Sequence, residues 1–414
     1  MSSAGRQVHF RVAAVAASAA ALGFLAGRDG SPLWQATRVL AVALLAVAAG
    51  AAILHLGRPW RGLALLLVGI AATAAGAGIA AAWLTKSGVG LTAAAGALGL
   101  AAGVVALGFG AADSTAGARG WWRAASAVAL LLVSALLVLS LAIAVAATNV
   151  PPTTLGGETP ADRGLAFEEA RFTAADGAEL AGWYLPTQNG AAVVLLHGAG
   201  STRSAVLDQA AVLARAGYGV LLFDARGHGT SNGRAMDFGW YGDADIEGAV
   251  GYLAARPGVD PSRIAAVGLS MGGEEAIGAA AADSRLRAVV AEGATGRTVA
   301  DKAWLSEEYG FRGLLQEGID HLTFWFADLL TEADPPIALQ EAVAAMAPRP
   351  LLLIAAGEIP DEQAVAARLQ ATAPERVEVW IVPAAGHTGG LVTAPEEWSA
   401  RVLAFLDAAM APEG

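Results

Sequence analysis

Cysteine is absent from this chain of 414 residues, and charged residues are scarce over the first 150 of them. The lack of cysteine excludes disulfide bonds, thiolate nucleophiles and cysteine-ligated zinc, and it fits any redox compartment. Charged residues make up 15% of the chain and hydrophobic residues 55%, against roughly 45–50% apolar residues in an average soluble domain. This composition excludes a disordered chain and argues against a purely soluble enzyme.

The two parts of the chain carry opposite net charges. Residues 1–150 hold nine basic and two acidic residues, a net of +7, whereas residues 151–414 hold 17 basic and 35 acidic residues, a net of -18. Basic residues are too sparse in the first part to form a nucleic-acid-binding patch, and the acidic second part would repel a phosphate backbone. We therefore predict no nucleic-acid partner.

Long stretches without charge fill the first part of the chain, and a bilayer core about 30 Å thick needs about 20 apolar residues per helix. The stretches are residues 12–27, 39–57, 62–85, 87–112 and 124–147. The first is the shortest and could instead be a signal peptide. Because more spans follow it, we interpret it as the first of about five spans, in a transmembrane helical domain over residues 1–148.

The basic residues of the connections predict how these spans are oriented. Six lie at the N-terminus and in the loops at 58–61 and 119–123, against three on the opposite set of connections. Cytoplasmic loops are the more basic ones, so we expect a multi-pass protein of the cell membrane with residues 151–414 outside the cytoplasm. Within the stretches His55 alone is ionisable, which favours an anchor over a transporter. Gly99 and Gly103 could bring helices together, including those of a homo-oligomer.

Proline and glycine mark a linker over residues 149–164, and alternating strand and helix patterns follow it. Two strand patterns flank the hairpin signature Asp176-Gly177. Further strands alternate with helices and are expected at 191–196, 218–223, 263–269, 287–292, 350–356 and 376–382. Residues 165–414 are therefore predicted to form a doubly wound, mostly parallel sheet with its site at the carboxyl ends of the strands.

The sequence Gly268-Leu269-Ser270-Met271-Gly272 lies between a predicted strand and a predicted helix. Glycines at these positions allow a sharp turn that projects the serine hydroxyl above the sheet, as in a nucleophile elbow. A tight strand–helix turn with a capping serine is the alternative explanation, but the flanking patterns are those of an elbow. Ser270 is the predicted nucleophile.

A serine nucleophile needs a base, and one of the six histidines is well placed for that role. Two belong to the membrane part, two precede Ser270, and His321 lies inside an insertion upstream of the strand expected to supply the acid. His387 follows the strand at 376–382 in a glycine-containing loop that can point the imidazole back at Ser270. The order Ser, acid, His then identifies His387 as the base.

Together these motifs resemble the α/β-hydrolase superfamily, particularly its esterase and serine-aminopeptidase-like branch, over roughly residues 165–410. The matching motifs are Gly268–Gly272, Gly386-His387, His197–Gly200 and Asp224–Gly229. By this resemblance the backbone N–H groups of Ala199 and Met271 form the oxyanion hole. The side chain of His197 would fix its turn, and the Asp224–Gly229 loop would be structural, with a pair between Asp224 and Arg226.

The acid of the triad departs from the family pattern. The family places an aspartate three residues after the glycine that ends the seventh strand, but three residues after Gly357 stands Pro360. Asp361 is one step late, and Glu358 and Glu362 compete with it. Acidic residues also favour the first turn of a helix. We predict Asp361 as the acid that orients His387, with Glu358 as the alternative.

The insertion at about residues 298–336 is predicted to be a small helical cap. Its apolar residues recur at a spacing of three to four, typical of an amphipathic helix: Phe311, Leu314, Leu315, Ile319, Leu322, Trp325, Phe326 and Leu329. Such a stripe usually packs against the body of its own domain. Over a hydrolase site it could also line an apolar acyl pocket.

These patterns predict a membrane-anchored serine hydrolase that cleaves a carboxylic ester, thioester or amide bond through an acyl-enzyme. The expected partners are the lipid bilayer and a small-molecule ester, lipid or peptide substrate. No metal and no organic cofactor is implied, because the sequence has no ligand cluster and no phosphate-binding glycine loop. The alternatives are an acyltransferase with the same triad and a non-catalytic receptor or assembly module on a hydrolase scaffold.

Overall fold

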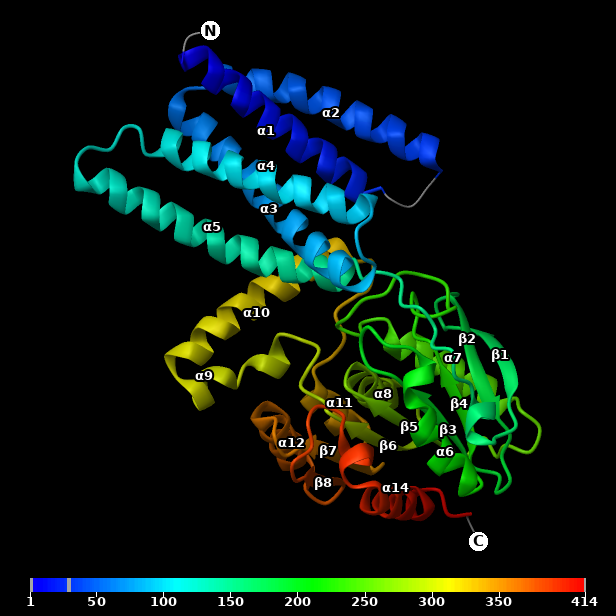
Figure 1. The fold of residues 1–414 in the computed structure, drawn as a ribbon. Coiled ribbons are helices and arrows are strands. Elements are labelled where there is room, and N and C mark those ends of the chain that lie inside the picture. Colours follow the sequence, from blue (N-terminus) through cyan, green and yellow to red (C-terminus); the bar gives the residue numbers. More distant parts are fainter. Residues whose placement is uncertain (1–2, 28–30, 413–414) are drawn as a thin grey trace. The chain divides into compact units, whose positions relative to one another are not determined.

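The computed structural model describes residues 3–27 and 31–412, which include a helical part and an α/β part (Figure 1). The chain divides into two compact units. One comprises Met1–Pro151 together with Tyr309–Glu332, and the other comprises Pro152–Glu308 together with Ala333–Gly414. We refer to them as the helical unit and the α/β unit.

Five long helices form most of the helical unit, as the sequence predicts. They are α1 (Ser3–Leu25), α2 (Pro32–His55), α3 (Arg58–Lys86), α4 (Leu91–Ser114) and α5 (Trp121–Thr148). Each contains a stretch long and apolar enough to cross a membrane.

Glycine lines the contact between α3 and α4. The glycines recur every seven residues on each helix: Gly62, Gly69 and Gly76 on α3, and Gly96, Gly103 and Gly110 on α4. A Cβ atom at Gly76 would lie 2.2 Å from the backbone nitrogen of Leu100, so a larger residue there would push the helices apart. Gly99 and Gly103, expected to bring helices together, both face α3 of the same chain.

Large apolar side chains on these helices are exposed. Leu44 and Leu45 on α2, Leu67 on α3, and Leu132 and Val133 on α5 all belong to this group. A water-soluble bundle buries such residues, whereas membrane helices pack through small residues and leave large apolar side chains for the lipid. The helical unit thus exposes large apolar side chains on helices that are long and apolar enough to cross a membrane.

An ion cluster joins three of these helices near their ends. Asp113 of α4 accepts hydrogen bonds from Nη2 of Arg11 at 3.0 Å and from Nε of Arg61 at 2.7 Å. The sequence places Asp113 just past a charge-free stretch, but α4 continues to Ser114 and includes it. The carboxylate ties α1 and α3 to α4 at the cost of burying paired charges.

The α/β unit is built on one eight-stranded sheet of order β1-β2-β4-β3-β5-β6-β7-β8 (Figure 1). Its strands are β1 (Glu168–Thr173), β2 (Glu179–Leu185), β3 (Ala192–Leu196), β4 (Gly219–Phe223), β5 (Ile264–Leu269), β6 (Leu286–Glu292), β7 (Leu351–Ala356) and β8 (Val377–Val382). β1 and β2 form the predicted hairpin, and β2 also pairs antiparallel with β4. The six strands β3 to β8 run parallel to one another. The predicted doubly wound, mostly parallel sheet is confirmed.

Helices connect the parallel strands. They are α6 (Leu207–Arg215), α7 (Gly242–Ala254), α8 (Met271–Ala282), α11 (Leu339–Ala345), α12 (Pro360–Thr372), α13 (Gly390–Thr393) and α14 (Pro395–Ala409), with short 3-10 turns at Pro160–Arg163, Arg203–Val206 and Ala300–Lys302. α6 and α14 share one hydrophobic core with the sheet, whereas α8 contacts α7 and α11. The carboxyl ends of the parallel strands are thereby left to carry the loops of the site.

The segment predicted to be a linker, 149–164, is mostly part of the α/β unit. Leu155 packs against its hydrophobic core, and the backbone N–H of Gly156 donates to Ser204 Oγ at 3.0 Å. Thr153 forms an isolated bridge with His228. Proline and glycine end α5 as expected, but the residues after them make specific contacts.

The insertion between β6 and β7 divides between the two units. It contains α9 (Leu305–Tyr309) and α10 (Phe311–Leu330), and the predicted amphipathic helix corresponds to α10. We expected the whole insertion to cap the α/β domain, whereas Tyr309–Glu332 cluster with the helical unit, where α10 packs on α5. The spacing of apolar residues identified the helix but not its partner.

Candidate active site

Ser270 occupies a sharp turn between β5 and α8. Its backbone has φ 54° and ψ -122°, a left-handed conformation that costs a non-glycine residue free energy. A Cβ atom at Gly268 would lie 2.2 Å from the carbonyl oxygen of Gly272, and one at Gly272 would lie 2.7 Å from that of His197. The two glycines are therefore required by the close approach of backbone segments, and the turn has the geometry of a nucleophile elbow.

His387 reaches Ser270 from the loop after β8. Its Nε2 lies 2.8 Å from Ser270 Oγ, within hydrogen-bond distance. The loop turns through Ala384 and Thr388, both at positive φ. The structure thus brings the predicted nucleophile and the predicted base into direct contact.

Glu362, on the first turn of α12, completes the chain of hydrogen bonds. Its Oε1 lies 2.6 Å from Nδ1 of His387, and its Oε2 accepts the backbone N–H of Ala356 at 2.8 Å. The carboxylate is almost fully buried, so the end of β7 holds it firmly toward the imidazole. A carboxylate only accepts hydrogen bonds, hence Nδ1 carries the proton and Nε2 accepts from the serine hydroxyl.

The sequence prediction of Asp361 as the acid is wrong, and so is the alternative Glu358. Both side chains are exposed in the structure. α12 begins at Pro360, so neighbouring residues point about 100° apart around its axis, and only position 362 faces His387. From position 362, one residue after Asp361, the glutamate side chain reaches Nδ1 of His387. An aspartate at position 362 is one methylene shorter and would not reach as far.

The carboxylate changes the acid–base properties of the imidazole. The hydrogen bond to Glu362 raises the pKa of His387 above its ordinary value, against an opposing effect of partial burial. A base with a raised pKa stays protonated to higher pH. It also takes a proton from serine more readily once it is neutral.

The turn after β3 lies beside the nucleophile. A Cβ atom at Gly198 would lie 3.2 Å from Ser270 Cβ, a tighter contact than most Cβ atoms make, so this turn lies directly against the nucleophile. Nδ1–H of His197 donates to the Gly198 carbonyl at 2.8 Å, while its Nε2 accepts the N–H of Ala225 at 3.0 Å. Burial lowers the pKa of His197 to about 3, so this ring is neutral and holds the turn in shape. Ala199 and Met271 remain the predicted oxyanion donors.

The loop after β4 is structural, but its ion pairs differ from the expected one. Asp224 pairs with Arg203 at 2.7 Å, and Arg226 pairs with Asp245 and Asp176. The expected pair between Asp224 and Arg226 is therefore wrong. Residues two apart in a turn point in different directions, and their partners come from segments distant in sequence.

Glu292, the last residue of β6, is a buried group that the sequence reasoning missed. Its Oε1 accepts the backbone N–H of Gly390 at 2.7 Å, and its Oε2 accepts Nε1–H of Trp398 at 2.9 Å. Burial raises the pKa of Glu292 despite these two donors. A carboxylate directly after the apolar run 288–291 at the end of β6 was the available signal. Through its hydrogen bond with Gly390, Glu292 holds the C-terminal end of the loop that carries His387.

Metal ligation has no candidate in the part of the chain that the structure describes. Within residues 3–27 and 31–412 no group of three or more His, Asp or Glu side chains is arranged to hold an ion.

The strand order and the turn at Ser270 are those of the α/β-hydrolase fold, and Ser270, His387 and Glu362 are joined by hydrogen bonds. The α/β unit has the fold of the α/β-hydrolase superfamily. Residues 187–352 match the family described as serine aminopeptidase, S33.

Two curated relatives and one solved structure are similar to this chain. Thiohydrolase aneE of Aspergillus aculeatus is 37% identical over 133 residues, 30% of this chain and 40% of the relative. Polyketide transferase grgF of a Penicillium species is 35% identical over 131 residues, 31% of this chain and 45% of the relative. The chain spans less than half the length of these two relatives. The Pyrococcus furiosus esterase Pf2001 superposes with a TM-score of 0.51 at 27% identity, covering 63% of this chain and 98% of the esterase.

Proposed function

We propose that this protein is a membrane-anchored serine hydrolase that cleaves an ester-type bond through Ser270, His387 and Glu362. The observation that carries the proposal is the unbroken chain of hydrogen bonds, 2.8 Å from Ser270 Oγ to Nε2 and 2.6 Å from Nδ1 to Glu362. A non-catalytic scaffold would have no need to keep a strained serine in contact with an oriented base. That argues against the receptor or assembly alternative.

The reaction follows from the positions of these groups. Ser270 Oγ attacks the carbonyl carbon of the substrate while Nε2 of His387 takes the hydroxyl proton, and Glu362 stabilises the imidazolium. The backbone N–H groups of Ala199 and Met271 donate to the negative oxygen of the tetrahedral intermediate. When that intermediate collapses, His387 gives the proton to the leaving alcohol or thiol. Water then attacks the acyl-enzyme with His387 as the base, releasing the acid and Ser270.

An ester or thioester is the bond class that the similarities favour. One relative is named a thiohydrolase, and a similar solved structure is that of an esterase. Both bond types have a carbonyl carbon and a good leaving group, as the triad requires. Substrate choice beyond that class depends on the pocket, since a fold does not fix a substrate.

The five apolar helices support the membrane anchor. Their exposed large apolar side chains and glycine-lined contacts suit a lipid environment. The excess of basic residues on one set of connections favours a cytoplasmic N-terminus and an extracytoplasmic α/β unit. On this proposal the substrates are extracytoplasmic or come from the membrane.

The test is covalent labelling of the detergent-solubilised full-length protein with a fluorophosphonate probe, together with hydrolysis of acyl esters and thioesters of graded chain length. We expect labelling and turnover in the native chain and neither in Ser270→Ala. Labelling that persists in Ser270→Ala would identify another nucleophile. Absence of labelling in the native chain would overturn the proposal.

Acyl transfer is the second candidate function, favoured by the similarity to the polyketide transferase. The same acyl-enzyme passes its acyl group to an alcohol or amine wherever water is excluded from the site. Adding acceptor alcohols to the hydrolysis assay separates the two. A transferase forms the new ester in preference to the free acid.

A further inference from the structure

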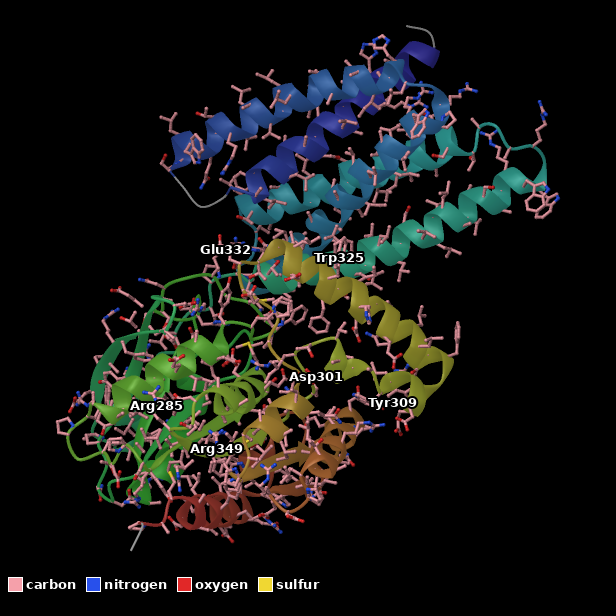
Figure 2. The ribbon with its side chains drawn as sticks, turned by 180° about the vertical axis from the view of Figure 1, so that it is seen from behind. Arg285, Asp301, Tyr309, Trp325, Glu332 and Arg349 are labelled. Carbon is pink, nitrogen blue, oxygen red and sulfur yellow. The ribbon has the colours of Figure 1, made fainter. Side chains whose placement is uncertain are left out.

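Helix α10 packs on α5 with its face of mostly small residues. Gly313, Thr323, Phe324 and Ala327 are its buried residues, and Thr323 Oγ1 lies 3.4 Å from the carbonyl oxygen of Ser140 in α5. At about 100° per residue these four positions fall within an arc of about 100°, so they share one side of the helix. Figure 2 labels Tyr309 and Glu332 at the two ends of this segment and Trp325 along it.

The large apolar side chains of α10 lie on the other side. Phe311, Leu314, Leu315, Trp325 and Leu329, which we call the α10 stripe, are each more than half exposed. A helix of a water-soluble protein turns such a stripe inward and leaves its polar residues in water. The α10 stripe is instead exposed in the part of the chain that the structure describes, although Phe324 on the opposite face of the helix is buried.

The surface that α10 joins indicates what covers the stripe. On α5, Leu131, Leu132, Val133 and Leu139 are also exposed, so apolar surface continues from one helix to the other within one compact unit. Packing through small residues, with large apolar side chains outward, is how helices associate in lipid. A protein partner would instead call for a patch bounded by polar residues, while this one is continuous with a membrane-spanning surface.

The depth of the contact also fits a membrane position. Ser140 precedes the end of α5 at Thr148 by eight residues, about 12 Å along the helix axis. α5 has 28 residues, about 42 Å, so a helix centred in a hydrocarbon core of about 30 Å would extend about 6 Å beyond it at each end. The contact with α10 then falls in the outer part of one leaflet, where amphipathic interfacial helices lie.

We propose that α10 is an interfacial membrane helix, with the α10 stripe immersed in the leaflet that contains the C-terminal half of α5. This inference rests on the proposed membrane anchor. α10 carries one arginine and three carboxylates, so burial of apolar surface, and not attraction to anionic headgroups, would hold it there. The hydrolase then has a lipid-immersed element inserted between β6 and β7 of its sheet, suited to esters that partition into the bilayer.

The chain lacks cysteine, so single cysteines can report the position of each residue in the full-length protein. We would attach an environment-sensitive fluorophore to Leu315→Cys or Leu329→Cys on the stripe, and to His321→Cys or Asp328→Cys as exposed polar controls on the same helix. The protein is reconstituted in phosphatidylcholine vesicles. Quenching is measured with doxyl-labelled lipid and with aqueous iodide.

We expect the stripe positions to be blue-shifted and quenched by doxyl lipid at least several-fold more than the polar controls, and the controls to be quenched by iodide. Leu132→Cys on α5 tests the anchor separately. If Leu132→Cys is quenched by lipid but the stripe positions are quenched by iodide or by neither agent, the inference is overturned and the anchor stands. If Leu132→Cys is not quenched by lipid, the anchor itself is wrong and the inference falls with it.

Discussion

The backbone of Ser270 adopts a conformation that is unfavourable for a residue with a side chain. A serine with φ 54° is strained, and the turn persists because Gly268 and Gly272 let three backbone segments meet and because the N–H of Ser270 donates to the Glu292 carbonyl at 2.7 Å. The sharp turn at Ser270 projects its hydroxyl group above the edge of the sheet. The position of the nucleophile therefore depends on Gly268 and Gly272, which have no side chains.

The carboxylate of the triad gives the sharpest prediction at this scale. Glu362→Gln removes the charge that stabilises the imidazolium and the acceptor that fixes its tautomer, so kcat should fall by about 10³- to 10⁴-fold. Asp361→Asn and Glu358→Gln alter exposed carboxylates on the same segment and should stay within about threefold of the native rate. Steady-state kinetics on a short-chain ester checks this. A crippled Asp361→Asn together with an active Glu362→Gln would reverse our assignment.

The same hydrogen bond predicts a pH dependence. Catalysis needs neutral His387, whose pKa is raised by Glu362, so kcat/KM should rise with pH through a midpoint above about 6.5, the ordinary value for histidine. In the residual activity of Glu362→Gln the charge that favours the imidazolium is gone. The midpoint should therefore move to lower pH. A midpoint unchanged by the substitution would mean that the carboxylate does not act on His387.

At the scale of elements, the β6 strand and the loop after β8 act together. Glu292 accepts from Gly390 at one end of that loop and from Trp398 at the start of α14, while His387 stands three residues before Gly390. A glutamine at this position offers only one acceptor oxygen to two donors. One buried donor is then left unsatisfied, which costs about 1–3 kcal/mol.

We expect Glu292→Gln to lower kcat by about 10- to 100-fold with KM nearly unchanged, because a small displacement of the base is costly. Positioning through His387 should also shift the acid limb of the pH profile, which a purely global loss of stability would not do. Glu378→Gln, an exposed glutamate on β8, is the matched control. Equal losses of kcat in Glu292→Gln and Glu378→Gln would mean that Glu292 does not position His387.

Local patterns within single helices, strands and loops determine which features of the site could be predicted from the sequence. The contact between Ser270 and His387 was predictable because each residue lies in a short local motif, after a strand whose apolar run is plain in the sequence. Glu362 was not, since its role depends on where α12 begins and on one extra methylene in its side chain. The partner of α10 was missed for another reason. Apolar periodicity identifies one face of a helix but not whether lipid or protein covers it.

At the scale of the whole molecule, charge on the connecting loops predicts the side of the membrane on which the α/β unit lies. With the N-terminus inside, five spans place a C-terminal tag outside the cell. Protease treatment of intact cells should remove the tag, while a cytoplasmic marker survives until the membrane is permeabilised. A tag protected in intact cells would put the active site in the cytoplasm.

The assignment of Tyr309–Glu332 to the helical unit has a consequence for biosynthesis. α1 to α5 leave the ribosome first, and the 157 residues from Pro152 to Glu308 follow before α10 is made. At about 5–20 residues per second, this interval lasts roughly 8–30 s. During it α5 is already made, but the surface around Ser140 that later receives Thr323 has no partner. Biogenesis therefore includes a late step in which a helix made within the hydrolase sequence completes an assembly begun by the N-terminus.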